Sequence, residues 1–248
     1  MVLYIIGLGL WDEKDITVKG LEAVKSCDRV YLESYTSRLS CSIEDMENLY
    51  GKSLVKADRD MVENKGEEIV QEAKEGNVAF LVIGDPFSAT THNDLRDRAE
   101  KEGVKVKIIH NASIITSVGI TGIDLYKFGK ITSIPFQNEN ITSPVQVIEK
   151  NKDAGLSTLV LFDLDPINEK YMTINEATNF LQRAGLKEDK LCVGLAGVGS
   201  GQPEILAGKL SELAREKFTL FPQCLIVPGN LHFMEEESLK RFTRASSS

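Results

Sequence analysis

The sequence has few of the residues that cross-link small secreted domains or bind catalytic metals. Its 248 residues include only four cysteines and three histidines. The cysteines form no CxxC pair and no two histidines have metal-ligand spacing, which argues against a disulfide framework and a catalytic zinc site. We expect no metal, and reduced, mostly buried thiols in a cytoplasmic protein. The four cysteines are Cys27, Cys41, Cys192 and Cys224.

Long apolar runs and an excess of positive charge are also missing. No run approaches the roughly 18 apolar residues that span a bilayer. Lys and Arg number 29 against 37 Asp and Glu, a formal charge of −8, so no broad basic surface for nucleic acid is expected. Met1–Leu10 is apolar but has neither a basic n-region nor a cleavage site, so we expect a first strand there and no signal peptide. We expect no membrane partner and no direct nucleic-acid partner.

What the sequence does contain is an alternation of short apolar strands and amphipathic helices. The six apolar residues of Val78–Ile83 lie between turn residues and predict a strand buried on both faces, as in a parallel sheet. This alternation indicates an α/β fold. Two α/β domains are expected, residues 1–111 and 112–248, with a frayed tail over Ala245–Ser248. The expected helices include Thr17–Lys25, Val62–Lys74, Thr91–Glu102, Pro144–Lys152, Ile174–Arg183, Pro203–Arg215 and Glu235–Arg241.

A glycine turn follows the first strand, at Gly7-Leu8-Gly9. A dinucleotide site needs a third small residue three positions later, and N–H groups free to bind pyrophosphate. That third position is Asp12, and Glu13 and Asp15 follow. Carboxylates beside a helix start repel an anion, which disfavours NAD. Two interpretations remain: the glycines serve chain geometry alone, or they let backbone approach a ligand that lacks a diphosphate.

Two further turns follow the strands that we expect at the centre of the first domain. In open α/β sheets, ligands bind outside the carboxyl ends of strands. Asp85 either accepts hydrogen bonds from a ligand there or closes an Asp-Pro turn with Pro86. After the next strand, we interpret His110 as a hydrogen-bonded histidine and Ser113 as a helix cap. The backbone of Ser113 and Ile114 lies at the same expected edge.

The second half repeats this pattern with less regularity. Phe162-Asp163, Gly197–Gly201 and Pro228–His232 each follow an expected strand. There is no nucleophile elbow and no Walker loop. The residues alone therefore indicate a two-part α/β protein whose strand ends form a cleft for an uncharged or zwitterionic ligand.

Several of these strand-end segments resemble those of the diphthine synthase family, a branch of the tetrapyrrole-methylase-like (class III) methyltransferases. The resemblance runs from Met1 to about Phe242. The stretches that begin at Tyr31 and Leu125 are specific to the branch, whereas the first glycine turn and the Gly-Asp-Pro turn occur across the superfamily. The resembling segments are Tyr4–Leu10, Tyr31–Ser37, Gly84–His92, His110–Ile114, Leu125–Gly129 and Pro228–Phe233.

This resemblance implies two α/β domains of the tetrapyrrole methylase type, with S-adenosylmethionine (AdoMet) in a cleft between them, and a homodimer. It implies methylation of the amino group of a 3-carboxy-3-aminopropyl-histidine on translation elongation factor 2, giving diphthine on the route to diphthamide, with S-adenosylhomocysteine released. The family's catalytic residues stay unassigned. We expect the loop after Glu33, through Tyr35 and Arg38, to contribute to the acceptor side, unless Tyr31 and Tyr35 are core or dimer residues. The positions carried over as AdoMet contacts are Leu10, Asp85, Ser88, Ser113, Ile114, Phe162, Ala207 and His232.

Two alternatives stay open at this point. A methyltransferase of the same fold acts on precorrins or other tetrapyrroles, and fold does not decide the substrate. A non-enzymatic module that binds AdoMet or a nucleotide would show the same glycine-rich strand ends.

Overall fold

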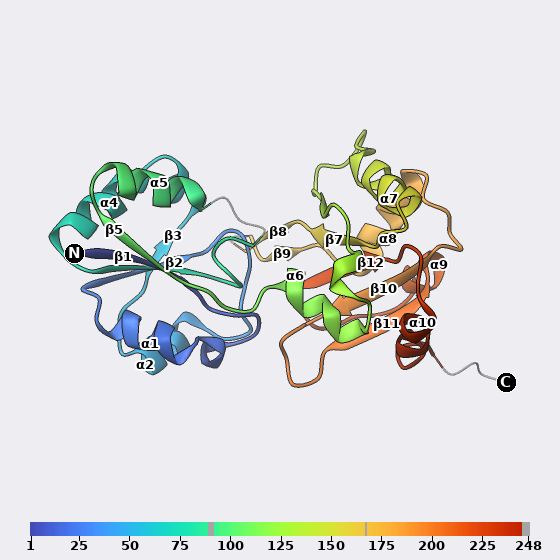
Figure 1. The fold of residues 1–248 in the computed structure, drawn as a ribbon, viewed down its shortest axis with the longest axis horizontal. Coiled ribbons are helices and arrows are strands. Elements are labelled where there is room, and N and C mark those ends of the chain that lie inside the picture. Colours follow the sequence, from blue (N-terminus) through green and yellow to red (C-terminus); the bar gives the residue numbers. More distant parts are fainter. Residues whose placement is uncertain (89–91, 167, 245–248) are drawn as a thin grey trace. The chain divides into compact units, whose positions relative to one another are not determined.

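The computed structural model describes residues 1–88, 92–166 and 168–244 of the chain (Figure 1). The chain divides into two compact units. Unit 1 is Met1–Ile115 with Asp165–Asn168, and unit 2 is Thr116–Leu164 with Glu169–Ser248. The domain boundary predicted after residue 111 falls shortly before this division. The predicted helix start at Thr91 and the predicted fraying of Ala245–Ser248 lie outside the described residues.

Unit 1 is built on a five-stranded sheet in the order β3-β2-β4-β1-β5, and all its neighbouring strands are parallel. Every residue of β4 is buried. Helices therefore cover both faces, as parallel sheets require, which confirms the predicted buried strand. The strands are β1 (Val2–Gly7), β2 (Arg29–Glu33), β3 (Val55–Ala57), β4 (Val78–Val82) and β5 (Lys105–Ile109).

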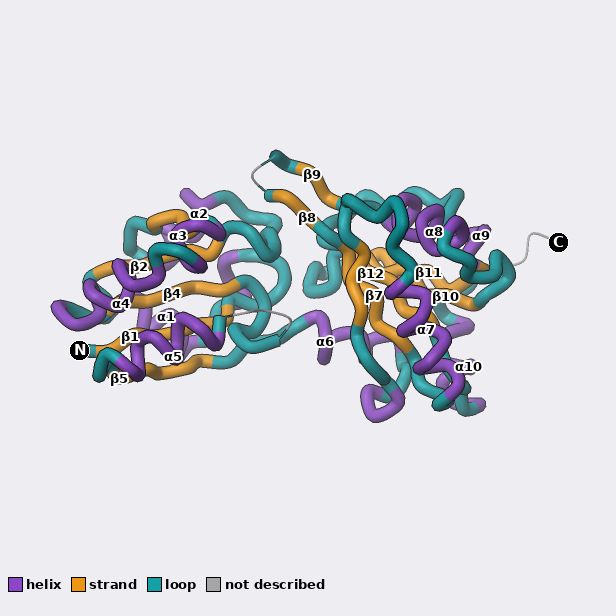
Figure 2. The backbone as a smooth tube through the Cα atoms, turned by 90° about the horizontal axis from the view of Figure 1, so that it is seen from above, coloured by secondary structure: helices purple, strands orange, loops and turns teal. Residues whose placement is uncertain are grey.

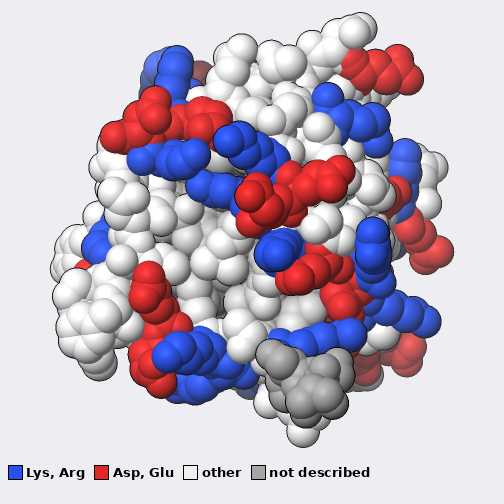
Figure 3. Space-filling view, turned by 90° about the vertical axis from the view of Figure 1, so that its right-hand side faces the viewer, with Lys and Arg blue, Asp and Glu red and all other residues white. Residues whose placement is uncertain are grey.

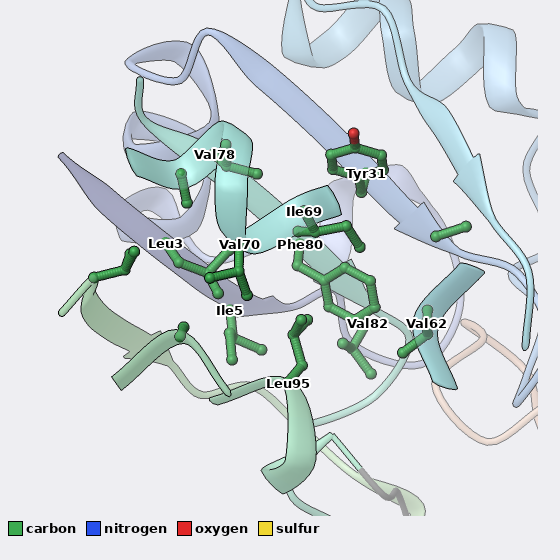
Figure 4. Close-up of a cluster of buried hydrophobic side chains, with 14 of the residues drawn as sticks. Leu3, Ile5, Tyr31, Val62, Ile69, Val70, Val78, Phe80, Val82 and Leu95 are labelled. Carbon is green, nitrogen blue, oxygen red and sulfur yellow. The ribbon is translucent and has the colours of Figure 1, made fainter. Parts of the chain in front are cut away.

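Alternation along the strands divides the core of unit 1 between the two faces of the sheet. Phe80 and Leu3 pack with side chains of α3, α4 and α5 (Figure 4). Leu81 and Ile6 point to the opposite face and pack with side chains of α1 and α2. The helices are α1 (Val18–Lys25), α2 (Ile43–Tyr50), α3 (Arg59–Glu63), α4 (Gly66–Glu75) and α5 (Asn93–Lys101).

Unit 2 also has a five-stranded sheet, in the order β11-β10-β12-β7-β6 (Figure 2). Only β6 and β7 are parallel, and the other pairings are antiparallel. The strands are β6 (Thr132–Ile134), β7 (Thr158–Phe162), β10 (Leu191–Ala196), β11 (Glu204–Lys209) and β12 (Gln223–Val227), with a small hairpin of β8 (Leu164–Asp165) and β9 (Lys170–Tyr171). The helices of unit 2 are α7 (Ser143–Asp153), α8 (Ile174–Arg183), α9 (Leu210–Leu213) and α10 (Phe233–Lys240). The short helix α6 (Ile114–Ser117) begins in unit 1 and ends in unit 2. Of the short 3-10 turns, η1 (Glu13–Asp15) belongs to unit 1, and η2 (Val118–Thr121) and η3 (Leu125–Lys127) belong to unit 2.

The predicted helix over Pro203–Arg215 is wrong. Residues Glu204–Lys209 form β11, which pairs antiparallel with all six residues of β10, and only Leu210–Leu213 is helical. The spacing of apolar residues fits a short strand as well as a helix, and the available edge of β10 decided between them. The glycine-rich turn at residues 197–201 was the missed signal, because such a turn between two apolar runs is typical of a hairpin.

The burial of most thiols agrees with the expectation drawn from composition. Figure 3 shows Lys and Arg interspersed with Asp and Glu on the face that it draws, with no extended basic field. Cys27, Cys192 and Cys224 are buried and Cys41 is half-buried, and all four are free thiols. None of the helices among the described residues is long and apolar enough to cross a bilayer.

Candidate active site at the strand ends of unit 1

The carboxyl ends of β1 and β4 meet at the centre of the unit 1 sheet. The helix that follows β1 packs on one face and the helix that follows β4 packs on the other. Neighbouring strands whose connections leave to opposite faces create the crevice in which α/β sheets bind ligands. Just beyond the strands, Gly84 N donates to Gly9 O at 2.7 Å and Gly9 N donates to Gly84 O at 3.3 Å. The candidate site is therefore built around this pair of glycines.

The glycines of the first turn are required by the protein's own packing. A Cβ on Gly7 would lie 2.6 Å from Gly84 O, and one on Gly9 would lie 2.5 Å from the Cβ of Asp15. Gly84 differs, because a Cβ there would meet only Ala112 O, at 3.9 Å. For Gly7 and Gly9 the geometry supports the chain-geometry interpretation. At Gly84, whose φ is +81°, an added Cβ would make only an ordinary van der Waals contact, so the left-handed backbone conformation is what favours glycine there.

Asp15 occupies the N–H groups that a dinucleotide would need. Its Oδ2 accepts from Leu10 N at 3.0 Å and from Trp11 N at 2.7 Å. The first long helix, α1, begins only at Val18 and is capped by the Thr17 hydroxyl. A carboxylate thus stands where a pyrophosphate would bind, which gives the disfavoured NAD interpretation a structural obstacle.

Asp85 joins the end of β4 to the end of β5. Its Oδ1 accepts from Phe87 N at 3.0 Å and Ser88 Oγ at 3.3 Å. Its Oδ2 lies 2.7 Å from His110 Nδ1 and accepts from Asn111 N at 3.2 Å. Burial acts to raise the pKa of this carboxyl, but the hydrogen bonds outweigh burial and hold the pKa below its ordinary value. Asp85 therefore closes its turn, as one of the two interpretations had it, and also orients His110.

Asn111 ties the same edge together from the β5 side, a role that the sequence analysis missed. Its Nδ2 donates to Gly7 O and to Asp15 O, both at 2.9 Å. The sequence did offer a signal for this role: Asn111 is a polar residue close behind the end of β5, the strand that pairs with β1. Ser113 is buried and its Oγ accepts from Ile115 N at 3.1 Å, which confirms the predicted helix cap.

Five of the eight predicted AdoMet contacts thus lie at one edge of unit 1. Leu10 and Asp85 flank the paired glycines, Ser88 follows Asp85 within the same turn, and Ser113 and Ile114 follow β5. Both the backbone N and the hydroxyl of Ser88 donate to Asp85, so its hydroxyl serves the turn. Their contact with AdoMet itself stays a prediction.

Unit 2 distributes its three predicted contacts along the sheet. Phe162 ends β7, whereas His232 follows β12, whose last residue pairs with Thr158 at the start of β7. Antiparallel pairing therefore places Phe162 and His232 at opposite ends of β7. Ala207 is buried in the middle of β11, separated from β7 by β10 and β12. These three contacts also stay predictions.

His232 is held in place by a buried carboxylate. His232 N donates to Glu235 Oε2 at 2.6 Å, and the His232 ring caps α10 by accepting from Met234 N at 3.4 Å. Lys127 Nζ lies 2.6 Å from the same Oε2. Burial acts to raise the pKa of Glu235, but these partners and Asp124 N hold it below its ordinary value. This network joins the branch-specific stretch Leu125–Gly129 to the segment Pro228–Phe233, which contains His232.

The loop after β2 is organised by Glu33, a fully buried carboxylate. It accepts from Tyr35 N at 2.8 Å, Thr36 N at 2.7 Å and Thr36 Oγ1 at 2.6 Å. Burial raises the pKa of Glu33 in spite of these bonds. Tyr31 and Tyr35 belong to the hydrophobic core, as the plainer of the two interpretations had it. An acceptor contact from the exposed part of this loop stays a prediction.

Comparison with known proteins agrees with this architecture. A model of the tetrapyrrole (corrin/porphyrin) methylases matches residues 2–214. The probable diphthine methyl ester synthase of Arabidopsis thaliana is 44% identical over 269 residues, which cover 96% of this chain and 97% of that protein. The chain belongs to the tetrapyrrole methylase family.

Within this family, the chain groups with the diphthine synthases. The diphthine synthase of Methanococcus aeolicus is 40% identical over 249 residues, which cover 96% of this chain and 97% of that protein. A crystal structure of diphthine synthase is 41% identical, with a TM-score of 0.93 and coverage of 98% of this chain and 96% of that one. The branch-specific stretches at Tyr31 and Leu125 had pointed to this tetrapyrrole methylase branch, and these relatives confirm it.

The unit 1 edge fits the donor that methyltransferases of this family imply. AdoMet carries a positive sulfonium and no phosphate. The edge carries carboxylates at Asp15 and Asp85, and the N–H groups of Leu10 and Trp11 at the first turn are already bonded to Asp15. Negative charge at this edge suits a ligand that carries a positive charge better than it suits a diphosphate.

Proposed function

We propose that this protein transfers methyl groups from AdoMet to the amino nitrogen of a 3-carboxy-3-aminopropyl group on a histidine of translation elongation factor 2, giving diphthine. The observation that carries the proposal is the identity of 40–44% over at least 96% of this chain to proteins named for diphthine and diphthine methyl ester synthesis. A similarity that extends over both units includes the parts that bind the acceptor, whereas a shared fold alone would leave the acceptor open.

AdoMet when bound supplies an activated methyl group, and the chain's residues have to align it with the acceptor nitrogen. Alignment alone is worth roughly 7–11 kcal/mol of barrier. We propose that Leu10, Asp85, Ser88, Ser113 and Ile114 hold AdoMet from unit 1. The family resemblance assigns the remaining contacts to Phe162, Ala207 and His232, although the pairing of β7 with β12 places Phe162 and His232 at opposite ends of β7. The hydrogen bonds that join the ends of β1, β4 and β5 support this assignment, because they make the unit 1 edge rigid before a ligand arrives.

The direct test supplies AdoMet and elongation factor 2 that carries the unmethylated aminocarboxypropyl-histidine. Mass spectrometry of the modified peptide should show stepwise gain of methyl groups and accumulation of the trimethylammonium product. Elongation factor 2 with an unmodified histidine is the matched control and should gain none. Methylation of a precorrin with none of elongation factor 2 would replace this proposal with the tetrapyrrole alternative, and AdoMet binding without transfer to any acceptor would favour the non-enzymatic alternative.

We further propose a cytoplasmic homodimer. Exposed apolar side chains gather in unit 2 where η3 and the start of α10 are hydrogen-bonded together, among them Tyr126 at 95% exposure and Phe233 at 66%. Apolar surface of this kind is typical of association sites. Sedimentation of the unaltered protein beside Tyr126→Glu tests this: a dimer that the substitution weakens supports it, and a monomer contradicts it.

A further inference from the structure

His110 has the geometry of a proton acceptor at the candidate site. Its Nδ1 lies 2.7 Å from Asp85 Oδ2. A carboxylate at that distance assigns the ring proton to Nδ1 and leaves the lone pair of Nε2 free, as in an Asp-oriented catalytic histidine. Asp85 is itself fixed by Phe87 N, Ser88 Oγ and Asn111 N, so the ring is held by a rigid support.

Exposure distinguishes the two members of this pair. The His110 side chain is 69% exposed, whereas that of Asp85 is 9% exposed. The carboxylate thus lies behind the ring, and the ring faces solvent at the edge where β4 and β5 end. It sits three residues before Ser113 in the chain, among the proposed AdoMet contacts of unit 1.

The other two histidines cannot take this role. His92 is buried, contacts the rings of Tyr35 and Phe80, and neither of its nitrogens has a polar partner in the part of the chain that the structure describes. Burial lowers the pKa of His92 to about 4. His232 accepts from Met234 N at Nδ1, so its neutral ring carries the proton on Nε2 and has no free lone pair there.

We propose that Nε2 of His110 takes a proton from the acceptor ammonium before each methyl transfer to nitrogen. This inference rests on the proposed function. The N–H bond of the ammonium breaks, its electron pair stays on nitrogen, and a new N–H bond forms at Nε2. The nitrogen lone pair then bonds to the methyl carbon of the sulfonium donor, while the carbon–sulfur electron pair passes to sulfur and leaves a thioether.

The same proton transfer can precede the second and the third methyl transfer to the acceptor nitrogen. The monomethyl and dimethyl ammonium products each carry an N–H bond, so His110 deprotonates them for the next transfer after it has released its proton to water. The trimethylammonium product has no N–H bond, and reaction at nitrogen ends there. One exposed base therefore serves three successive transfers.

Charged groups reach the surroundings of His110 from three segments of unit 1. From the turn after β4, the Asp85 carboxylate faces Nδ1 directly. From the segment after β1, the Asp15 carboxylate accepts from Leu10 N and Trp11 N, and it is the Asp15 backbone carbonyl that accepts from Asn111 Nδ2. On β5 itself, Lys107 lies over the Tyr4 ring at 5.3 Å. The charged group nearest the His110 ring is therefore the Asp85 carboxylate.

The test replaces His110 while keeping its hydrogen bond. His110→Asn retains an N–H group that can reach Asp85 but removes the nitrogen that titrates. We expect N-methylation to fall about 100-fold near pH 7, with the KM for AdoMet changed by no more than about twofold. The deficit should shrink as the pH rises above the pKa of the acceptor amine, because solution then supplies the free amine.

Asp85→Asn in the same background separates orientation from proton transfer. At saturating AdoMet, the double variant should be little slower than His110→Asn alone, since both substitutions affect one proton transfer. A deficit that stays constant with pH would show that His110 only positions the loop, and unchanged rates would also overturn the inference. The unaltered protein's transfer to elongation factor 2 tests the proposed function, whereas only the ratio between variant and unaltered protein tests His110.

Discussion

The two units carry sheets of equal strand number, yet they arrange functional residues in different ways. In unit 1 every strand runs the same way, so residues that follow β1, β4 and β5 meet at one edge. In unit 2 the antiparallel pairing of β7 with β12 sends Phe162 and His232 to opposite ends. The rule that ligands lie outside the carboxyl ends of strands therefore locates a site in unit 1. The same rule locates no site in unit 2, because Phe162 and His232 lie at opposite ends of β7 there.

A second difference concerns what fixes each region. At the unit 1 edge, Asp15, Asp85 and Asn111 hold three chain segments through side-chain bonds to backbone. In unit 2, Glu235 holds His232 N and Asp124 N together with Lys127. Both regions use a carboxylate with a lowered pKa, but only Asp85 orients a side chain able to carry out chemistry.

The largest expected effect contrasts a tight glycine in each unit. Gly7→Ala would push a Cβ to 2.6 Å from a backbone carbonyl, and we expect it to destabilise unit 1 by about 3 kcal/mol, the upper end for overpacking. Gly194→Ala, in β10, would instead meet the tip of the Phe218 ring at 2.8 Å. The other close atom is Ile174 Cδ1 at 3.0 Å, and both atoms are the far ends of side chains that can shift by a change of χ1 or χ2 in Ile174 and of χ1 in Phe218, so the cost should be about 1 kcal/mol.

Denaturant unfolding can follow the glycine variants unit by unit. Trp11 is the single tryptophan and lies in unit 1, so its fluorescence reports that unit, while hydrogen exchange of β10 amides reports unit 2. Equal losses for Gly7→Ala and Gly194→Ala would show that the backbone contact at Gly7 can relax.

The next effect compares the two carboxylates. Asp85→Asn and Glu235→Gln should each cost about 2 kcal/mol at pH 7, because each removes charged hydrogen bonds from a buried group. Only Asp85→Asn should also slow methyl transfer when AdoMet is saturating. A similar loss of rate in Glu235→Gln would mean that unit 2 contributes to the chemistry as well as to binding.

The pH dependence of stability follows from the same carboxylates. A carboxyl with a pKa below its unfolded value stabilises the fold above that unfolded value, about pH 4, and loses the contribution as the pH falls through the folded pKa. Acidification from pH 5 should thus weaken the unaltered protein more than Asp85→Asn. Parallel curves for both proteins would contradict the lowered pKa.

The smallest effect concerns two capping boxes, one in each unit. Ser42 caps α2 with Asp45, and Thr173 caps α8 with Glu176. Ser42→Ala and Thr173→Ala should each cost about 1 kcal/mol in denaturant unfolding and leave methyl transfer unchanged. A loss of activity from either one would show that the helix start reaches further toward the site than its contacts indicate.

Local patterns determined much of the fold. The apolar run before Gly84 was enough to predict β4, and Thr17 was enough to predict the start of α1, because strand burial and helix capping depend on residues close in sequence. The family resemblance also lay in short contiguous stretches. β11 was misassigned, because its identity depends on pairing with β10, which the pattern of Glu204–Lys209 does not contain.

The sequence by itself determined that this is an α/β protein of the tetrapyrrole methylase type and that its strand ends carry the polar residues. Only the tertiary structure decided what those residues do. Asp85 and His110 are 25 positions apart and look independent in the sequence, yet the parallel neighbours of β1 bring them to 2.7 Å. The tertiary structure also showed that Gly7 and Gly9 are required by close packing and that the Asp15 carboxylate binds N–H groups of the first turn. Strand pairing sets such long-range contacts, whereas sequence spacing reports only local ones.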